Sequence, residues 1–464
     1  MRASSRNVLG FALALSLASG AAACGSKGRT LDTAPGVAPD SAHPGDIRDV
    51  DPHGVYRAAG LLVHGSPLGF VGSVGFLGSG SADSTGVLVS IALANRALEF
   101  RPEGSLQRAG YTVSIDFHAK GGDSTVASEL SHETVRVASA RETSASEPNI
   151  VFEKLVRVPP GEYTMLLSVQ DDRSPEAGSL RDTLTVPRLG ARSLSSIVPV
   201  FRATPRSSTD TAPSLIANPS ATAIFGRDSV VRFYLEGYAL PDSARLSIAV
   251  LDDAKELVLR DSAMLEPSGQ VASAVRELPV ARMGPGRFTI VASLVGSADS
   301  VSTPLFVSFG PGVGILSFDE MLQRLRYFAT PEQLRALGAT PRSERAAAWA
   351  QFWRETDPVS STAEHEALRD YFDRIASANR RFAGEGVDGW LTDRGKVYVA
   401  LGAPDRVLVE DDRRTGMRAT SQLWEYEDYD VRLVFVSDFN FGRWRLTPGS
   451  ELDFEQALQR ARLH

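Results

Sequence analysis

Two stretches of this chain are built from short runs in which apolar and polar residues alternate, and this pattern constrains the fold more than any other feature. Turn residues, mainly Gly, Asp and Ser, separate the runs in residues 55–190 and again in residues 191–310. A period of two residues points successive side chains to opposite faces of a strand. Each stretch therefore predicts an antiparallel β-sandwich. The runs lie at 86–93, 111–117, 134–138, 150–158 and 163–169, and then at 230–235, 244–251, 271–275, 288–294 and 304–309.

A short signature recurs in the two stretches. Pro160-Gly161 precedes the aromatic residue Tyr163, and Pro285-Gly286 precedes Phe288 at the same spacing. Pro-Gly favours a tight turn in which Gly takes a positive φ, and the aromatic residue then opens the next strand. The recurrence predicts a duplicated sandwich module. Residues 187–227 are interpreted as the connector, with their apolar part packed on one module.

The period changes to a helical one after residues 310–314, a Gly-Pro-Gly-Val-Gly segment that predicts a hinge. Ser317 and Glu320 have the spacing of a capping box, and Thr330 and Thr340 each precede a proline, as N-cap residues do. A further helix is expected over residues 363–382. Five runs of period two then follow, which predict strands at 396–401, 406–410, 422–426, 431–436 and 443–446.

These patterns define one fold class. We expect a multidomain, mainly β chain, with two antiparallel β-sandwich modules followed by a C-terminal α+β domain at residues 315–464, in which helices pack on an antiparallel meander. The last domain is long enough to have its own core, so we expect it to fold alone.

The N-terminus predicts a secretory signal over residues 1–23. Arg2 and Arg6 precede an apolar run of about ten residues, too short to span a bilayer, and small residues follow. The sequence Ala-Ala-Cys24 resembles the lipobox of bacterial lipoproteins, in which the cysteine is lipidated. Ordinary cleavage after Ala23, giving a secreted periplasmic protein, is the alternative. Residues 24–54 are expected to be a flexible tether.

The residues after Cys24 are Gly25 and Ser26, neither of them acidic. By resemblance to enteric lipoproteins this indicates the outer membrane, with the protein facing the periplasm or the surface. We expect two partners, which are the membrane, bound through the N-terminal lipid anchor, and a protein of the envelope.

Composition argues against several other classes of function. The 49 Lys and Arg residues against 56 Asp and Glu residues give a net charge of −7, which argues against nucleic-acid binding. A single cysteine excludes intrachain disulfides and cysteine-based zinc clusters. The seven histidines are scattered. We therefore expect no metal and no cofactor.

One motif in the C-terminal region is specific. Residues 389–395, Gly-Trp-Leu-Thr-Asp-Arg-Gly, resemble the motif that names the GWxTD-domain family of bacterial envelope proteins. Residues 352–358, 374–382 and 401–405 also fit that family, although its usual Trp-x-x-Arg-Asp-Pro reads Trp353-Arg-Glu-Thr-Asp-Pro358 here. The resemblance covers the C-terminal third of the chain and implies an envelope protein, without implying an activity. The candidate site residues are Gly389, Trp390, Thr392, Asp393, Arg394 and Gly395.

Two interpretations of this motif are open. In the structural one, Thr392 and Asp393 accept backbone N–H groups in a turn, and Gly395 takes a positive φ before a strand. Trp390 then fills the space between helix and sheet, and Arg394 pairs with a carboxylate such as Asp405.

In the other interpretation, Asp393 and Arg394 form a polar pair in a ligand pocket of an envelope enzyme that acts on carbohydrate or peptide. Against it, the sequence offers no convergent acid, base or nucleophile set, so we predict no catalytic residue. We expect a non-enzymatic cell-envelope lipoprotein that binds a protein partner as a scaffold or assembly component.

Overall fold

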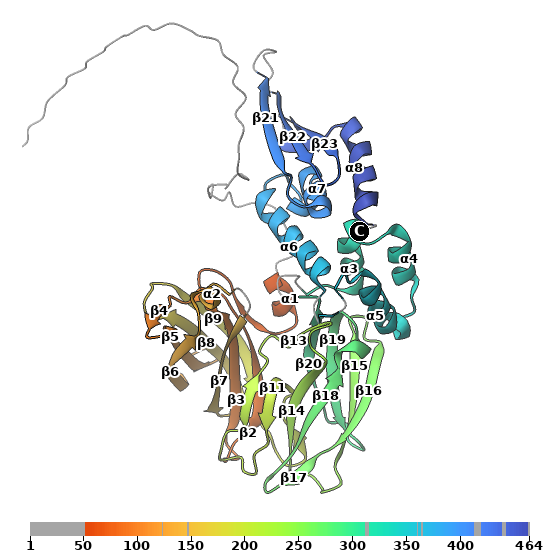
Figure 1. Ribbon diagram of the computed structural model, residues 1–464. Coiled ribbons are helices and arrows are strands. Elements are labelled where there is room, and N and C mark those ends of the chain that lie inside the picture. The colour runs from red at the N-terminus through yellow and green to blue at the C-terminus, as the bar shows by residue number, and fades with distance from the viewer. Residues whose placement is uncertain are drawn as a thin grey trace, which may run out of the picture.

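The computed structural model describes residues 52–122, 124–145, 148–310, 315–359, 361–362, 365–412, 419–438 and 442–462 (Figure 1). Cys24, the predicted signal peptide and residues 311–314 of the predicted hinge lie outside this part of the chain. None of the helices in the described ranges is long and apolar enough to span a membrane.

The first sandwich follows the short helix α1 (Pro52–Ala58). One sheet has the order β1-β2-β3-β7, and the other has the order β4-β5-β8-β9, with β6 also paired to β5. Val89 of β3 and Ile115 of β5 are fully buried in the core between the sheets. The elements are β1 (Leu62–His64), β2 (Phe70–Gly78), β3 (Thr85–Ala94), η1 (Asn95–Ala97), β4 (Arg101–Glu103), β5 (Leu106–Ala119), β6 (Thr125–Val137), α2 (Ala140–Thr143), β7 (Pro148–Val158), β8 (Gly161–Asp171) and β9 (Ala177–Val186).

The second sandwich has sheets of order β12-β11-β14-β18-β17, with β10 paired to β14, and β13-β20-β19-β15-β16. All pairs are antiparallel except β13 with β20. The elements are β10 (Ser193–Leu194), β11 (Val198–Thr204), β12 (Ser214–Ala217), β13 (Thr222–Ile224), β14 (Val230–Tyr238), β15 (Arg245–Asp252), β16 (Leu257–Met264), β17 (Glu266–Ser268), β18 (Val271–Pro279), η2 (Val280–Arg282), β19 (Gly286–Leu294) and β20 (Ser300–Ser308).

The two sandwiches share their strand order. In one sheet β6-β5-β8-β9 corresponds to β16-β15-β19-β20, and in the other β2-β3-β7 corresponds to β11-β14-β18. Gly161 pairs with Val186 and Gly286 with Val307, so the recurring Pro-Gly signature occupies the same place in both. This agreement supports the predicted duplication. The predicted positive φ is wrong for Gly161, which begins β8. In the second sandwich φ is positive, at 154° for Gly286 and 73° for Gly284.

Residues 187–227 are more than a connector, because β11 and β12 are strands of the second sandwich. The apolar side chains of β11, Val198 and Val200, pack with Leu77 and Leu88 of the first sandwich and with Tyr234 of β14. The two modules are therefore joined through a small hydrophobic cluster of their own.

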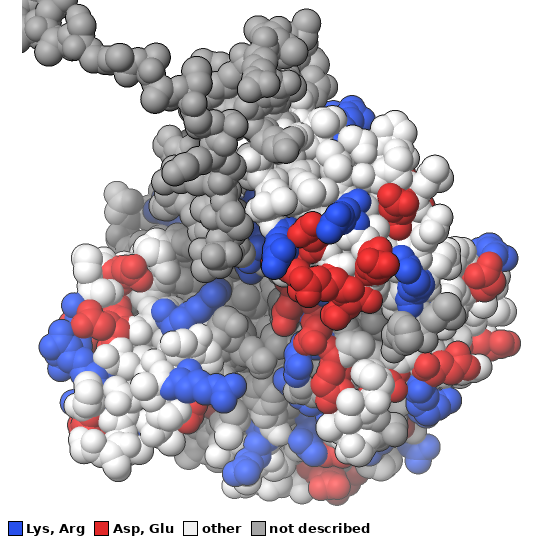
Figure 2. Space-filling model, turned by 45° about the horizontal axis from the view of Figure 1, so that its top comes forward, with Lys and Arg blue, Asp and Glu red and all other residues white. Residues whose placement is uncertain are grey.

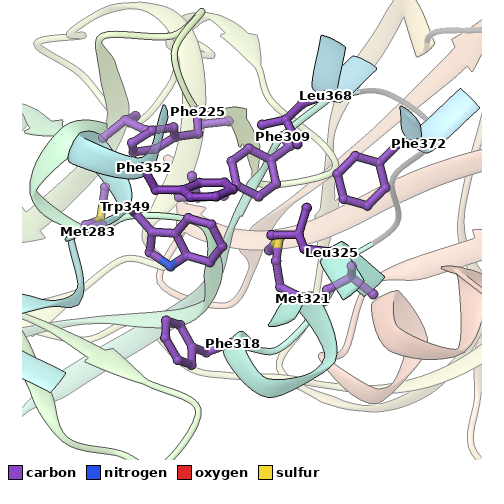
Figure 3. Packing of buried hydrophobic residues seen from close by; sticks show 14 of the residues in the cluster. Phe225, Met283, Phe309, Phe318, Met321, Leu325, Trp349, Phe352, Leu368 and Phe372 are labelled. Carbon is purple, nitrogen blue, oxygen red and sulfur yellow. The ribbon is translucent and has the colours of Figure 1, made fainter. Parts of the chain in front are cut away.

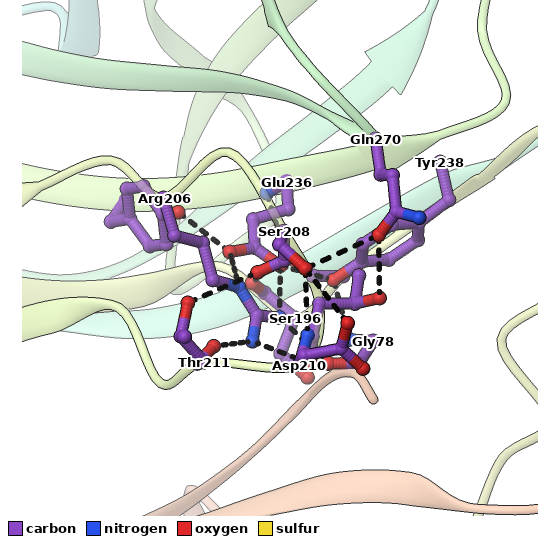
Figure 4. Close-up of polar contacts among 12 residues, drawn as sticks. Gly78, Ser196, Arg206, Ser208, Asp210, Thr211, Glu236, Tyr238 and Gln270 are labelled. Carbon is purple, nitrogen blue, oxygen red and sulfur yellow. Dashed lines mark hydrogen bonds and ion pairs between the residues drawn. The ribbon is translucent and has the colours of Figure 1, made fainter. Parts of the chain in front are cut away.

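A buried ion pair lies beside this cluster (Figure 4). Arg206 donates from Nε and Nη2 to the two carboxylate oxygens of Glu236, both at 2.8 Å, and their side chains are 3% and 0% exposed. Arg206 Nη2 also donates to the Gly78 carbonyl at 2.7 Å, and the Gly78 N–H donates to the Tyr238 hydroxyl. Because Gly78 ends β2, this polar cluster connects the first sandwich to the second.

The C-terminal part consists of helices followed by an antiparallel sheet of order β21-β22-β23-β24. The fold class, mainly β with antiparallel sheets and then C-terminal helices with antiparallel strands, is confirmed. The elements are α3 (Phe318–Arg324), η3 (Leu325–Tyr327), α4 (Pro331–Ala339), η4 (Arg342–Glu344), α5 (Arg345–Thr356), α6 (Glu366–Arg381), η5 (Gly389–Leu391), α7 (Asp393–Leu401), β21 (Arg406–Asp412), β22 (Ala419–Tyr426), β23 (Val431–Asp438), β24 (Arg443–Leu446) and α8 (Pro448–Ala461).

Two local predictions in this part are wrong, and one helix was not predicted. The predicted strand at 396–401 is wrong, because these residues lie in α7. Residues Val397 to Leu401 are all buried. An apolar run that is buried on every side has no helical stripe, so its sequence cannot be distinguished from that of a buried strand. The predicted N-cap at Thr340 is wrong, because Thr340 ends α4 and a 3₁₀ turn precedes α5. The capping box at Ser317 and the N-cap at Thr330 form as predicted. The last helix, α8, was not predicted.

One hydrophobic cluster runs from the second sandwich into the C-terminal helices (Figure 3). The Phe309 ring centroid lies 5.2 Å from that of Trp349 on α5 and 6.0 Å from that of Phe372 on α6. Trp353 packs on Phe225 at 5.3 Å. An isolated C-terminal fragment would expose these rings to water, so the continuity argues against independent folding of residues 315–464.

Candidate functional site

The candidate motif spans η5 and the first turn of α7, where two glycines allow backbone segments to touch. A Cβ atom added at Gly389 would lie 2.2 Å from the Ala378 carbonyl oxygen of α6, and one added at Gly395 would lie 1.8 Å from the Gly389 carbonyl oxygen. Gly395 lies inside α7, so the prediction that it takes a positive φ before a strand is wrong. Both glycines are required because no side chain fits.

Thr392 is the N-cap of α7. Its Oγ1 accepts the Gly395 N–H at 2.9 Å and donates to the Gly389 carbonyl at 2.8 Å, and the residue is 4% exposed. An N-cap acceptor of this kind satisfies one of the N–H groups left free in the first turn of a helix. Thr392 therefore accepts a backbone N–H as predicted, although it does so at a helix start and not in a turn before a strand.

Trp390 is buried, as the structural interpretation predicts. Its backbone N–H donates to Asn379 Oδ1 at 3.0 Å, and its ring packs edge-on against Tyr327 with centroids 6.3 Å apart. The guanidinium carbons of Arg326 and Arg324 lie 5.0 and 5.6 Å from the ring centroid. The ring thus packs against α3 and η3, and the backbone N–H holds η5 to the end of α6.

Asp393 accepts a backbone N–H, but from a distant strand and not from its own turn. Its Oδ2 accepts the Leu446 N–H of β24 at 2.8 Å, and Oδ1 lies 3.3 Å from Lys396 Nζ. Lys396 is also 3.0 Å from Glu451 of α8. Burial lowers the pKa of Lys396, but the carboxylates of Glu451 and Asp393 more than offset this, and the pKa of Lys396 lies above its ordinary value.

Arg394 pairs with Glu385, so the predicted pairing with Asp405 is wrong. Arg394 Nη2 lies 2.7 Å from Glu385 Oε1, and its guanidinium stands between the rings of Phe382 and Trp444 at 5.1 and 4.8 Å. Burial lowers the pKa of Arg394, and the hydrogen bond to Glu385 opposes that shift. Asp405 instead accepts the Glu427 N–H at 2.7 Å.

Glu385 is the functional partner that the sequence did not reveal. It is 5% exposed, and its second oxygen accepts the Trp444 N–H at 3.1 Å. The flanking Gly384 and Gly386 both have positive φ, which only glycine adopts readily. A glutamate between two glycines is typical of a tight loop around a buried side chain. This pattern at 384–386 is the sequence feature that could have identified Glu385.

Together these contacts close one edge of the sheet. Strand β24 is the last strand in the sheet, and the Trp444 and Leu446 N–H groups face away from β23 because the N–H of Thr447 donates to Val434 of that strand. Glu385 and Asp393 accept those two edge N–H groups. Unpaired edge N–H groups invite pairing with other chains, so the motif protects the edge while it anchors β24 to α7.

Asp393 and Arg394 have separate partners, and neither lines the cleft of about 620 Å³ between α1 and β20. Across the ranges that the structure describes, there is no cluster of three His, Asp or Glu side chains suited to a metal ion.

Residues 313–442 match the model of the GWxTD domain. The match contains Glu385, residues 389–395 and the helices that pack on the second sandwich, and it ends just before β24. A comparison with curated proteins finds no significant match to the chain.

Several solved structures resemble parts of the chain only weakly. The red sea bream transglutaminase is 11% identical with a TM-score of 0.16, covering 55% of this chain and 33% of its own. Latent PorU from Porphyromonas gingivalis is 11% identical with a TM-score of 0.23, covering 54% and 20%. The BSP domain of a biofilm associated protein is 9% identical with a TM-score of 0.17, covering 53% and 52%. The chain thus spans at most about half of these proteins, and likenesses this weak carry no functional argument.

Proposed function

We propose that the chain is a non-enzymatic lipoprotein of the bacterial cell envelope that acts as a scaffold or assembly component and binds a protein partner. One observation carries the proposal: the polar side chains of the GWxTD motif are engaged in holding the fold together. Thr392 caps α7, Asp393 and Glu385 hold β24, and Arg394 holds Glu385. A catalytic group must instead be directed at a substrate.

The joined architecture supports a scaffold. The hydrophobic cluster and the ion pair at Arg206 connect the two sandwiches, and the aromatic cluster connects the second sandwich to the GWxTD domain. Figure 1 shows the GWxTD domain stacked on one end of the second sandwich, with the first sandwich alongside. Such connected modules present binding surfaces in a fixed relative position, as a scaffold requires.

Charge suggests the nature of the partner. The chain has a net charge of −7, and Figure 2 shows Asp and Glu side chains gathered near the middle of the face that it presents, with Lys and Arg around them. An acidic surface attracts a basic one and speeds its association. We therefore propose a partner with a basic surface.

The lipid anchor at Cys24 is the first part of the proposal to test. Several acyl chains hold a protein firmly, whereas a protein without them stays in solution. Cys24→Ser should therefore move the protein from the membrane fraction to the soluble periplasm almost completely. A wild-type protein that is soluble with an unmodified N-terminus would refute the anchor and favour a secreted protein.

The second test separates a scaffold from an enzyme at Asp393. Asp393→Asn keeps an oxygen for the Leu446 N–H and loses only the charge next to Lys396, so it should lower the free energy of unfolding by about 1 kcal/mol. Function, measured by complementation of a deletion strain, should survive. The exposed Asp373→Asn on α6 is the matched control. A stable Asp393→Asn protein that fails to complement would support the enzyme alternative.

A further inference from the structure

A small recess lies where the second sandwich meets the C-terminal helices. It has a volume of about 30 Å³ and is lined by Gly286 at the start of β19, Phe318 of α3, and Arg345 and Trp349 of α5. Its lining shares Asp252 and other residues with the cleft of about 620 Å³ next to α1, so the recess adjoins that larger space.

Two hydrogen-bond donors in this recess have no acceptor. Trp349 is 1% exposed, and its indole N–H finds no partner among the described residues; the same holds for the buried Nε–H of Arg345. The two residues are one helical turn apart on α5, and both pack on Phe318, with the Arg345 guanidinium 3.8 Å from the ring centroid. Figure 3 shows the indole nitrogen on the side of Trp349 that faces Phe318. Buried donors in native proteins almost always have acceptors.

Of the three arginines that line the recess, Arg345 is the one without an ion pair among the described residues. Arg342 pairs with Asp252 and also lies 3.7 Å from Asp253 and 3.6 Å from Glu256, and Arg287 lies 2.7 Å from Glu320. Arg345 has no carboxylate within ion-pair distance in the part of the chain that the structure describes, and its guanidinium stacks on Phe318. The recess therefore offers one cation and two donors that have no acceptor.

The size and surroundings of the recess select the acceptor. The recess has room for a water molecule or for an oxygen of a flat group. Asp252 and Asp253 at the boundary with the larger cleft would also repel a doubly charged anion. A singly charged carboxylate fits the charge and the space, and guanidinium groups bind carboxylates through charge-assisted hydrogen bonds.

We propose that the recess between Arg345 and Trp349 is a binding site for the carboxylate of a ligand whose remainder lies in the adjoining cleft. The cleft supplies hydroxyl groups of Thr289, Ser302 and Thr303, which can bind polar groups next to the carboxylate. A free small carboxylate and the C-terminal carboxylate of a peptide present the same chemistry to Arg345. The larger cleft distinguishes them, because only the peptide would also fill it.

The indole N–H of Trp349 reports binding directly. The full-length chain contains five tryptophans, so ¹⁵N labelling of the indoles gives a simple spectrum in which Trp349→Phe identifies the signal. Titration with sodium acetate should shift that signal saturably, and sodium chloride at equal ionic strength should not. A short peptide with a free C-terminus should bind more tightly than acetate if the cleft takes part, and its C-terminal amide should not bind. Equal affinity of peptide and acetate would assign the site to small carboxylates.

Variants at Arg345 test the cation. Arg345→Gln should weaken acetate binding at least tenfold, and Arg345→Lys, which keeps the charge without the planar donors, should weaken it less. Arg354→Gln, an exposed position on the same helix, should bind like the wild type. An indole signal that responds equally to chloride, that ignores acetate, or that shifts identically in a folded Arg345→Gln protein would overturn the proposal and assign the recess to an ordered water.

Discussion

The ion pair between Arg206 and Glu236 gives the sharpest prediction about stability. Arg206→Met keeps most of the side-chain volume but removes the two hydrogen bonds to Glu236 and the one to the Gly78 carbonyl. It leaves a carboxylate that is 0% exposed without its cation. Breaking a buried pair in this way costs about 3–5 kcal/mol. Tyr234 still donates to Glu236 at 2.6 Å, so we expect a value near the lower end, about 3 kcal/mol.

Matched variants separate burial from charge. Arg232 lies on β14, as Glu236 does, and forms an exposed pair with Glu277 of β18; Arg232→Met should cost less than about 1 kcal/mol. The double variant Arg206→Met/Glu236→Leu removes the stranded charge and should recover part of the loss. Urea unfolding followed by circular dichroism measures the wild type, these three variants and the single variant Glu236→Leu. A cost for Arg206→Met no larger than that for Arg232→Met, or a double variant as unstable as the sum of its single changes, would refute the reasoning.

Two further predictions concern the C-terminal part. Gly395→Ala places a Cβ 1.8 Å from a backbone oxygen and should destabilise the protein by about 3 kcal/mol. In the control Gly338→Ala, in α4, the added Cβ meets only Leu322 at 3.5 Å, and the change should stabilise the protein by up to about 1 kcal/mol. Equal melting temperatures of the two variants would contradict this. Burial lowers the pKa of His365, whose Nδ1 accepts the Leu368 N–H. As the pH falls, the unfolded chain therefore binds a proton at this histidine before the folded chain does. The free energy of unfolding should then fall below pH ~6.5, by up to about 1.4 kcal/mol per pH unit. His365→Asn keeps an N-cap acceptor, and melts at pH 7.5 and 5.5 should show a smaller loss than in the wild type.

The features that were predictable from the sequence are those set by local pattern. The alternating runs became β5, β8, β15 and β19, because each of these strands has a buried face and a more exposed face. The apolar run at 86–93 became β3, which is buried on both faces. The capping box at Ser317 and the N-cap at Thr330 form because each side chain bonds groups within the first turn of its own helix. Trp390 was predicted as a core residue on size and polarity alone.

The features that were missed depend on contacts between distant segments. Helix α7 is surrounded by other elements, so its run of apolar residues carried no helical stripe. The partner of Arg394 is Glu385 and not Asp405, and this choice depends on how the loop at 384–386 returns to β24. The continuity of the core across residue 310 is likewise invisible in a sequence whose Gly-Pro-Gly segment resembles a hinge.

The two most buried ion pairs described here do the same structural work. Arg206 with Glu236 binds the backbone of Gly78, in the other sandwich, and Arg394 with Glu385 binds the backbone of Trp444, in the edge strand. A buried ion pair contributes little net stability over an apolar alternative, but a misplaced segment would leave its charges unsatisfied. Each pair therefore specifies which backbone segment docks at that place. In a chain with several similar sandwich strands, this selection fixes one arrangement of modules, which is what we propose that a scaffold presents to its partner.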